Sequence, residues 1–337
     1  MSEPCAVSVT SRIYGCLFGS LIGDAMGAPV EGKTYQEIAA THGEVSTFDG
    51  TGTDDTAIRL ILIDAIVASG GHPRLDDFAQ SFMRARTSSY DLWWVPVKNM
   101  FHKLEAGVTL PVDAGWGNMH SSSSAMAIAP LGILNAGDPL RAARETFEIA
   151  SLIHSGPSGF ARDAACAMAA AVAAAFVPAA TVESVLAAAT AFLLPRSARE
   201  MREAINGALD LAAFSKDYET FRAAYYEQHL REIVADPRET VPVALALFRL
   251  AHGDPNRAIV LGANFGRDAD TIATMAGGLA GAFQGLETLN PRWVEQVKER
   301  NGATYDQTVE YFRSALAQRS REEHAHARLI DDLLETG

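Results

Sequence analysis

Two short motifs place carboxylates and hydroxyls together, each directly before a segment of small or apolar residues. The first, TDDT at 53–56, precedes the apolar run 58–67, and the second, RDADT at 267–271, precedes a run of Ala, Gly and Thr. Asp and Thr are common at helix N-termini, where backbone N–H groups and the helix dipole favour oxygen and negative charge. Helix capping therefore explains either motif taken alone. One cap needs only one acid, however, and each motif supplies two.

A third acidic motif, GDAMGAPVE at 23–31, adds two carboxylates in an equally apolar setting. Burying so many like charges without cations costs too much free energy, so the sequence predicts a bound divalent metal. All donors are hard oxygens with no paired His or Cys nearby, which favours Mg²⁺ or Mn²⁺ over zinc or copper. Their number suits two ions, which at about 3.5–4 Å apart would bridge and activate a water. The six acids are Asp24, Glu31, Asp54, Asp55, Asp268 and Asp270.

Glycines recur at every fourth position in two segments. A glycine inside a helix costs about 0.5–1 kcal/mol relative to alanine, so a stripe of glycines needs a compensating gain, such as close backbone approach. We therefore expect buried helices over 13–27 and 271–285, at least one of them packed through its stripe. The alternative is that these segments are loops, where glycine is unrestricted. The stripes are Gly15, Gly19, Gly23 and Gly27, and Gly277, Gly281 and Gly285 with Gly278 beside them.

Helix signals dominate the rest of the chain, while regularly spaced β-branched runs with hairpin turns are missing. The sequence therefore predicts an all-α fold. The Pro- and Gly-rich breaks at 70–73, 107–118, 155–159, 235–242 and 253–256 are too short for an interdomain linker, so one domain over 1–337 is expected. Its C-terminal helices, within 287–337, either pack on the body or project from it. Helices are predicted at 140–153, 161–176, 180–193, 197–213, 217–234, 239–252, 290–300 and 305–317.

Charge and cysteine content exclude some classes of partner. The 337-residue chain has a net charge of −13 and no cluster of Lys and Arg, which argues against binding of nucleic acid. Three widely spaced cysteines, Cys5, Cys16 and Cys166, suit a reducing compartment and favour a cytoplasmic location. Residues 13–30 are apolar enough to suggest a secretory leader, but a carboxylate at bilayer depth, here Asp24, costs a few kcal/mol. We interpret this segment as a buried helix and expect no membrane partner.

The motifs, in this order, resemble the ADP-ribosylglycohydrolases, a family that includes the hydrolase acting on ADP-ribosylated dinitrogen reductase and the ADP-ribosyl-acceptor hydrolases. The resemblance covers most of residues 12–286, through GSLIGDAMGAPVEG, GTDDTAIRLILIDAI, SSSSAMAIAPLGIL, ASLIHSGPSGFARDAACAMAAAVAAAF and GRDADTIATMAGGLAGAFQG. It implies a compact all-α fold, an orthogonal multi-helix bundle, with two Mg²⁺ or Mn²⁺ ions in a cleft. It also implies hydrolysis of an N- or O-glycosidic bond at the anomeric carbon of an ADP-linked ribose.

Site residues follow from the same resemblance by position. The implied metal ligands are Thr53, Asp54, Asp55, Asp268, Asp270 and Thr271. Glu31 falls where the family has an acidic residue implicated in catalysis, so the candidate catalytic residues are Glu31, Asp55 and Asp270.

Two departures from the family pattern concern the substrate. Relatives that act on ADP-ribosyl proteins commonly carry an Asn-Gly-Ser-Ala-Met-Arg type of stretch, whereas 122–127 reads SSSAMA, and 266–268 reads Gly-Arg-Asp where Gly-Gly-Asp is more familiar. Arg267 then either meets a substrate phosphate or carboxylate or pairs with a neighbouring acid. The serine run either cradles an oxygen at a helix N-terminus or forms a polar loop. The expected substrate contacts are Ser122, Ser123, Ser124, His154 and Arg267. His154 matches a family histidine near the phosphates of the ligand. The alternative is a structural role, which is common for a lone histidine at a helix end.

In the expected mechanism the ions hold the ribose hydroxyls and a bridging water, and the acidic cluster stabilises an oxocarbenium-like transition state. Glu31 acts as general base or shapes the cleft. Two rival functions remain. One is hydrolysis of a smaller, nucleoside-like N-riboside by the same metal site, which the alanine at 127 favours. The other is a non-catalytic crystallin-like or ADP-ribose-binding protein. In such a protein we expect acids of the TDDT and RDADT motifs to be replaced, whereas both motifs are complete.

Overall fold

A computed structural model describes residues 7–335, except for the side chains of 301–303. This part of the chain is all-α, as expected, and its β pairing consists of two isolated bridges, Thr34 with Gly266 and Trp116 with Ser155. The α-helices are α1 Val9–Gly27, α2 Tyr35–Thr41, α3 Asp54–Ala68, α4 Leu75–Ser89, α5 Val95–Glu105, α6 Ala129–Leu134, α7 Pro139–Ile149, α8 Gly159–Ala175, α9 Val182–Ala191, α10 Arg199–Phe214, α11 Tyr218–Gln228, α12 Pro237–Leu250, α13 Pro255–Ala263, α14 Ala269–Gln284 and α15 Pro291–Glu335.

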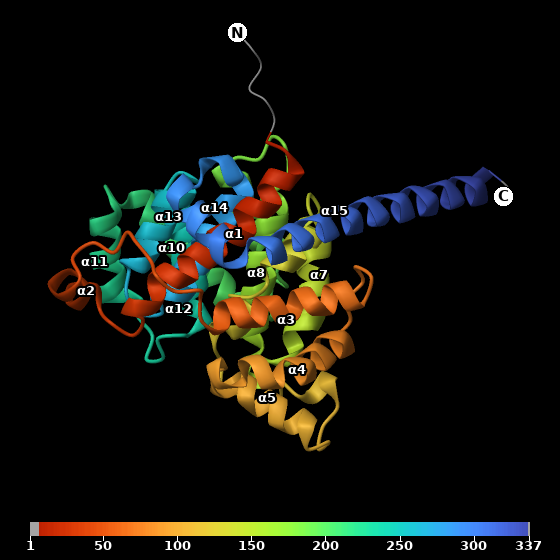
Figure 1. The fold of residues 1–337 in the computed structure, drawn as a ribbon, viewed down its shortest axis with the longest axis horizontal. Helices are drawn as coiled ribbons and strands as arrows, with labels where there is room; N and C mark the ends of the chain where they lie inside the picture. The colour runs from red at the N-terminus through yellow and green to blue at the C-terminus, as the bar shows by residue number, and fades with distance from the viewer. Residues whose placement is uncertain (1–6, 336–337) are drawn as a thin grey trace, which may run out of the picture.

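Helices α1 and α14 lie side by side at the centre of the fold (Figure 1). A Cβ added at Gly15 would lie within 3.0 Å of the Gly281 backbone, and one added at Gly19 would lie equally close to Gly277. The order of these pairs makes the helices antiparallel, and any side chain larger than hydrogen would separate them. The prediction that the glycine stripes are buried and packed is confirmed for both helices.

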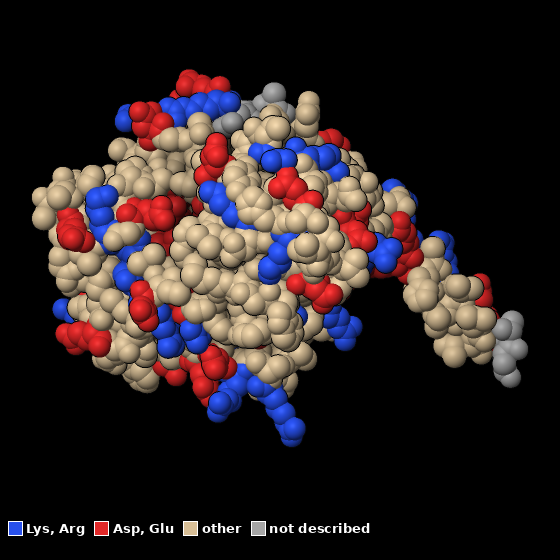
Figure 2. Space-filling model, turned by 90° about the horizontal axis from the view of Figure 1, so that it is seen from below, with Lys and Arg blue, Asp and Glu red and all other residues tan. Residues whose placement is uncertain are grey.

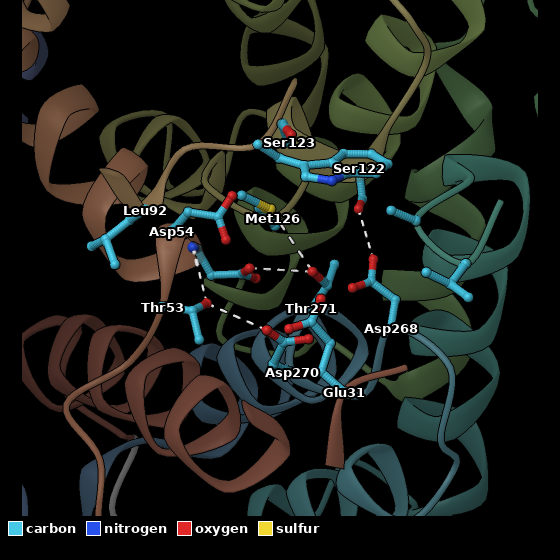
Figure 3. A pocket seen from close by; sticks show the side chains of 14 residues that line it. Glu31, Thr53, Asp54, Leu92, Ser122, Ser123, Met126, Asp268, Asp270 and Thr271 are labelled. Atoms are coloured by element: carbon cyan, nitrogen blue, oxygen red, sulfur yellow. Dashed lines mark hydrogen bonds between the residues drawn. The ribbon is translucent and has the colours of Figure 1, made fainter. Parts of the chain in front are cut away.

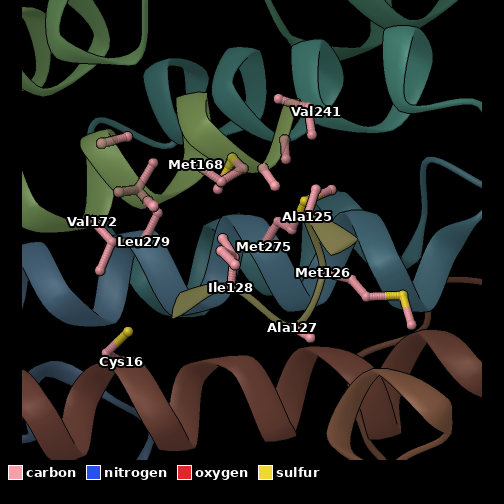
Figure 4. Close-up of a cluster of buried hydrophobic side chains, with 14 of the residues drawn as sticks. Cys16, Ala125, Met126, Ala127, Ile128, Met168, Val172, Val241, Met275 and Leu279 are labelled. Atoms are coloured by element: carbon pink, nitrogen blue, oxygen red, sulfur yellow. The ribbon is translucent and has the colours of Figure 1, made fainter. Parts of the chain in front are cut away.

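The remaining helices cover this central pair. The alanine-rich helix α8 is almost completely buried against α14, α12 and α7, and α13 packs on the opposite flank of α14. Methionines fill the space where α8 and α14 meet the segment before α6, among them Met126, Met168 and Met275 (Figure 4). Helix α3 packs beside α4, and α4 and α5 lie at the lower edge of the body in Figure 1.

Helix α15 both packs on the body and projects from it. Near its middle, Tyr305 stacks edge-on against Phe18, and Asp306 accepts a hydrogen bond from the Tyr14 hydroxyl. Arg319 is buried and donates to the Gly71 carbonyl oxygen. Beyond this anchor the helix extends away from the body (Figure 1). Both alternatives for the C-terminal segment therefore apply, each to a different part.

Three predicted boundaries are wrong. The helices expected at 290–300 and 305–317 form one helix, which continues through the weak helix formers Asn and Gly at 301–302. The helix expected at 217–234 ends at Gln228, because the backbone N–H of Arg231 turns to donate to the Glu239 carboxylate. The break expected at 235–242 already contains the start of α12, where Pro237 takes the first helical position, which requires no N–H donor.

Helix α1 and the surface charges relate to two predictions from the sequence: that the protein has no membrane partner and that it does not bind nucleic acid. Helix α1 with the following turn, Val9–Val30, is long and apolar enough to cross a membrane, but it is mostly buried inside the fold. On the face drawn in Figure 2, acidic and basic side chains are interspersed, and no continuous basic patch lies on it. Neither observation identifies a partner.

Substitution of Gly281 by alanine is expected to lower the free energy of unfolding by about 1–3 kcal/mol, because the new methyl group would clash with the Gly15 backbone. Gly207, in α10, is the matched control because a Cβ there meets open space. Gly207→Ala should stabilise the protein by about 0.5–1 kcal/mol. Urea denaturation of both variants measures the difference, and equal effects would contradict the proposed role of the glycine stripe.

Candidate metal and active site

The N-terminus of α3 is held against α1 by one carboxylate. Asp24, fully buried in α1, accepts hydrogen bonds from the backbone N–H groups of Thr53 and Thr56 at 2.9 and 3.0 Å, and from both of their hydroxyls. These backbone donors belong to the first turn of α3, which has no helical partner for them. Asp24 therefore caps α3 from a different helix. Asp24 belongs to one of the three acidic motifs, but both of its oxygens are engaged by these donors of α3, which gives it a structural role.

The loop before α14 is held by the segment that follows α1. The Arg267 N–H donates to the Lys33 carbonyl oxygen, and the Gly32 N–H donates to the Arg267 carbonyl oxygen, both at 2.7 Å. Gly266 and Arg267 adopt positive φ angles of 82° and 63°, and a Cβ at Gly266 would clash with the Lys33 carbonyl. Because of this pairing, Glu31 lies next to the start of α14. Ligand oxygens of Glu31, Asp268 and Asp270 lie within 4.8 Å of one another.

The three acidic motifs meet around one cavity of about 320 Å³ (Figure 3). All six residues expected to bind metal lie on its wall, together with Glu31. The predicted acids are thus brought together from opposite ends of the chain. The lining consists of Glu31, Thr53, Asp54, Asp55, Leu92, Trp94, Ser122, Ser123, Met126, Val234, Ala235, Asp268, Asp270 and Thr271.

Hydroxyl groups orient three of the four aspartates in the cavity. Ser122 donates to Asp268 at 2.9 Å, Thr271 donates to Asp55 at 3.2 Å, and Thr53 donates to Asp270 at 3.3 Å (Figure 3). The second carboxylate oxygens of Asp55 and Asp270 are buried and have no hydrogen-bond partner. An unpaired buried carboxylate oxygen is costly unless a cation or a proton compensates it. The donor set, all oxygen, fits a hard divalent cation such as Mg²⁺ or Mn²⁺.

Burial and mutual repulsion raise the pKa values of all these acids. Burial, followed by the charges of Asp24 and Glu31, raises the pKa of Asp54 to about 7, against a hydrogen bond from the Trp94 backbone that lowers it. Burial raises the pKa of Asp268 to about 7, against the hydrogen bond from Ser122. The pKa values of Asp55 and Asp270 are raised further, first by burial and then by neighbouring carboxylates. At the exposed side of the cavity, partial desolvation and then Asp24 raise the pKa of Glu31.

The serine run forms a single 3-10 turn, Ser122–Ser124, rather than the start of an α-helix. The Ser122 N–H donates to the Ala235 carbonyl oxygen and the Ser123 N–H to the Ser121 hydroxyl, so these two N–H groups are not available to a ligand. Only the side chains of Ser122 and Ser123 reach the cavity, while Ser124 is buried behind them. Of the two alternatives for the serine run, this turn favours the polar loop, and hydroxyl contacts from Ser122, Ser123 and Ser124 with a substrate remain a prediction.

His154 supports this turn from behind. It is fully buried, and its two ring nitrogens lie 2.8 Å from the Ser124 hydroxyl and 3.1 Å from the Ser121 hydroxyl. Burial, with the charge of His120, lowers its pKa to about 3, so the ring is neutral at physiological pH. His154 does not line the cavity. Its contact with substrate stays a prediction, whereas its contact with the serine turn is observed.

Arg267 points away from the metal-site acids. Its guanidinium forms a bidentate pair with the fully buried carboxylate of Glu239, at 2.8 and 3.1 Å, and also bonds the Arg231 carbonyl oxygen. It is not part of the cavity lining. The geometry therefore favours the alternative in which Arg267 pairs with a neighbouring acid. A contact between Arg267 and a substrate stays a prediction.

Comparison with known proteins agrees with this geometry. Residues 6–326 match the family model described as ADP-ribosylglycohydrolase. The chain belongs to this family. It is 27% identical over 317 residues to the uncharacterized protein YegU of Escherichia coli (84% of this chain, 90% of YegU) and 24% identical over 322 residues to ADP-ribosylhydrolase ARH3 of Bos taurus (84% and 87%). It is similar in fold to an ADP-ribosylglycohydrolase-related protein complex, with a TM-score of 0.70 and 22% identity over 91% of this chain and 99% of the other.

One wall of the cavity in this ADP-ribosylglycohydrolase was not anticipated from sequence. Apolar side chains of Leu92, Trp94, Met126, Val234 and Ala235 face the carboxylates. Among the residues lining the cavity in the described chain, none is Lys, Arg or His. The adjacent tryptophans of DLWWVP at 91–96 were the available signal, but their spacing alone does not distinguish a core residue from a ligand contact.

Replacing Asp24 by asparagine is expected to lower the free energy of unfolding by about 1–3 kcal/mol, because an amide NH₂ would face backbone donors of α3. Asp64→Asn is the control, since Asp64 belongs to α3, is exposed and pairs with Arg84. It should change stability by less than about 0.5 kcal/mol. If chemical denaturation gives the same stability for both variants, Asp24 does not cap α3.

The metal-free protein is expected to lose stability as the pH rises. Asp54 and Asp268 have pKa values of about 7 in the folded state, against about 4 when unfolded. Folding therefore favours their protonated forms, and stability falls as the pH rises from about 4 through 7. In EDTA, the Tm should be lower at pH 8 than at pH 5.5. Asp268→Asn should reduce this dependence, and a variant that keeps the wild-type pH slope would contradict the assignment.

Proposed function

We propose that this protein hydrolyses the glycosidic bond at the anomeric carbon of an ADP-ribosyl group, using a cavity that binds two Mg²⁺ or Mn²⁺ ions. One observation carries the proposal: Asp55 and Asp270 line the same cavity, and each has one buried carboxylate oxygen without a hydrogen-bond partner. Such oxygens are suited to cations. Membership of the ADP-ribosylglycohydrolase family and likeness to a relative named ADP-ribosylhydrolase support the reaction class.

The residues that would hold the ions are Thr53, Asp54, Asp55, Asp268, Asp270 and Thr271. When bound, the ions supply positive charge that offsets the carboxylates, bind ribose hydroxyls and lower the pKa of a water. The hydroxyls of Ser122, Thr271 and Thr53 each donate to one oxygen of an aspartate, and the second oxygens of Asp55 and Asp270 stay free to bind a ligand. The hydroxyl donors therefore fix the orientation of these carboxylates before a ligand binds.

Glu31 is suited to the proton transfer. Its carboxylate lies beside Asp268 and Asp270 but on the exposed side of the cavity, where water and substrate enter. The attacking water forms a bond from its oxygen to the anomeric carbon, and Glu31 accepts the proton that this water loses. The bond from the anomeric carbon to the leaving group breaks with its electron pair on the leaving group. The surrounding carboxylates stabilise the positive charge that develops on the sugar ring.

A second candidate function is hydrolysis of a smaller, nucleoside-like riboside at the same site. The observation in its favour is that, among the described residues, those lining the cavity include no Lys, Arg or His to offset a diphosphate. The buried Ala127, which stands where relatives commonly have arginine, points the same way. Side-by-side assays of ADP-ribosyl-arginine, an ADP-ribosyl-serine peptide and a panel of nucleosides distinguish the two functions.

Asp270→Asn is expected to reduce turnover at least about 100-fold, because it removes a charged ligand from the metal site. Elemental analysis should find two Mg²⁺ or Mn²⁺ ions per wild-type chain and fewer per variant chain, with unchanged helicity by circular dichroism. Asp64→Asn, on the exposed side of α3, serves as control. Full activity of Asp270→Asn after chelation and resupply of Mg²⁺ would refute the assignment. Near-zero metal in the loaded wild type would favour the non-catalytic alternative.

A further inference from the structure

We propose that Trp94 is a specificity residue, the surface on which a planar, nitrogen-linked leaving group of the substrate stacks. This inference rests on the proposed function, since it names the part of the substrate that lies beyond the anomeric carbon. Trp94 lines the cavity together with the carboxylates, and its backbone lies near enough to Asp54 to lower the pKa of that carboxyl. No role in the metal site explains an indole at this position.

The local backbone directs Trp94 into the cavity. Trp93 and Trp94 are both extended, with φ and ψ of −64° and 138°, and −78° and 171°. Successive side chains of an extended segment point to opposite sides. Trp93 is buried in an aromatic cluster, with ring centroids 5.1 Å from Phe82 and 5.3 Å from Phe101. Because Trp93 is anchored in the core, Trp94 faces the other way, toward Asp54 and the cavity.

The position of Trp94 relative to the acids indicates that its indole contacts the leaving group of the substrate. The anomeric carbon has to lie next to the carboxylates, because the attacking water is activated there. Trp94 and Asp54 line the same cavity, and the Trp94 backbone lies near the Asp54 carboxyl, so the group attached directly to the anomeric carbon is the first to reach the indole. Leu92 also lies on this wall, while Val234 and Ala235 continue the apolar lining. The leaving group therefore enters apolar surroundings adjoining the charged floor.

The chemistry of this wall favours one class of leaving group. An indole face attracts cations and stacks on flat π systems. The carboxylates disfavour an anion, and within residues 7–335 as described no Lys, Arg or His lines the cavity to offset one. A guanidinium and a nitrogen heterocycle share the required properties, being planar, linked through nitrogen, and neutral or cationic. A serine-type oxygen linkage offers no flat face to the indole.

The test compares Trp94→Ala, Trp94→Phe and Trp116→Ala on three substrates: ADP-ribosyl-arginine, a nucleoside with a heteroaromatic base, and an ADP-ribosyl-serine peptide. Trp116 is the matched control because it is 64% exposed and does not line the cavity. Trp94→Ala should lower kcat/KM for the nitrogen-linked substrates about tenfold, mainly through KM, the size expected for loss of one stacking contact. Trp94→Phe should recover most of this loss. The serine-linked substrate should change less than about twofold, and Trp116→Ala should leave all three unchanged.

The outcomes separate this inference from the proposed function. Equal losses on nitrogen- and oxygen-linked substrates would mean that Trp94 only shapes the cavity, and would overturn the inference. Unchanged rates in Trp94→Ala would overturn it too, while leaving the hydrolase intact. Should the metal-loaded wild type cleave none of the three, the proposed function fails. Calorimetric binding of the same compounds then decides the inference: tighter binding of nitrogen-linked compounds by wild type than by Trp94→Ala supports it, and equal binding overturns it.

Discussion

The close antiparallel contact between α1 and α14 is the constraint on which the site depends. Glycine at four successive turns of α1 lets the two backbones touch, and the last of these, Gly27, faces the backbone of Asp270. The C-terminal end of α1 therefore meets the N-terminal end of α14. The first end leads to Glu31, and the second begins with Asp268 and Asp270. Residues more than 200 positions apart share one cavity because nothing larger than hydrogen separates the helices that carry them.

Asp24 extends this arrangement to the third motif. Because its carboxylate accepts from the first turn of α3, it fixes Thr53, Asp54 and Asp55 against the end of α1. The same acid raises the pKa of Asp54 through its charge. Asp24 thus positions the candidate metal ligands of α3 and also makes Asp54 harder to ionise in the absence of a cation. Structural and electrostatic roles coincide in a single buried carboxylate.

The cavity lining combines two kinds of side chain. Carboxylates and hydroxyls come from α3, α14 and the 3-10 turn, and Trp94 with Leu92, Met126, Val234 and Ala235 adds apolar surface. The nearest arginine in sequence to the metal-site acids, Arg267, is turned outward to Glu239. Its positive φ and the hydrogen bonds of its backbone with Gly32 and Lys33 serve the loop that brings Glu31 to Asp268. Arg267 thus orders the loop and adds no charge to the cavity wall.

Much of the fold and the donor set of the site could be predicted from sequence, since they depend on local spacing. Four-residue glycine repeats mark a helix face, and paired Asp and Thr mark helix starts that need more than capping. Other features depend on segments that meet only in the folded chain. Asp24 and Asp268 look alike in sequence, yet one meets backbone donors of α3 and the other a hydroxyl and a cavity. Likewise, the burial of Trp93 turns Trp94 toward the acids. The sequence by itself determined that the fold is helical and which oxygens α1, α3 and α14 carry, because those follow from neighbours along the chain. Only tertiary packing decided which oxygens remain unpaired, because hydrogen-bond partners there come from distant helices.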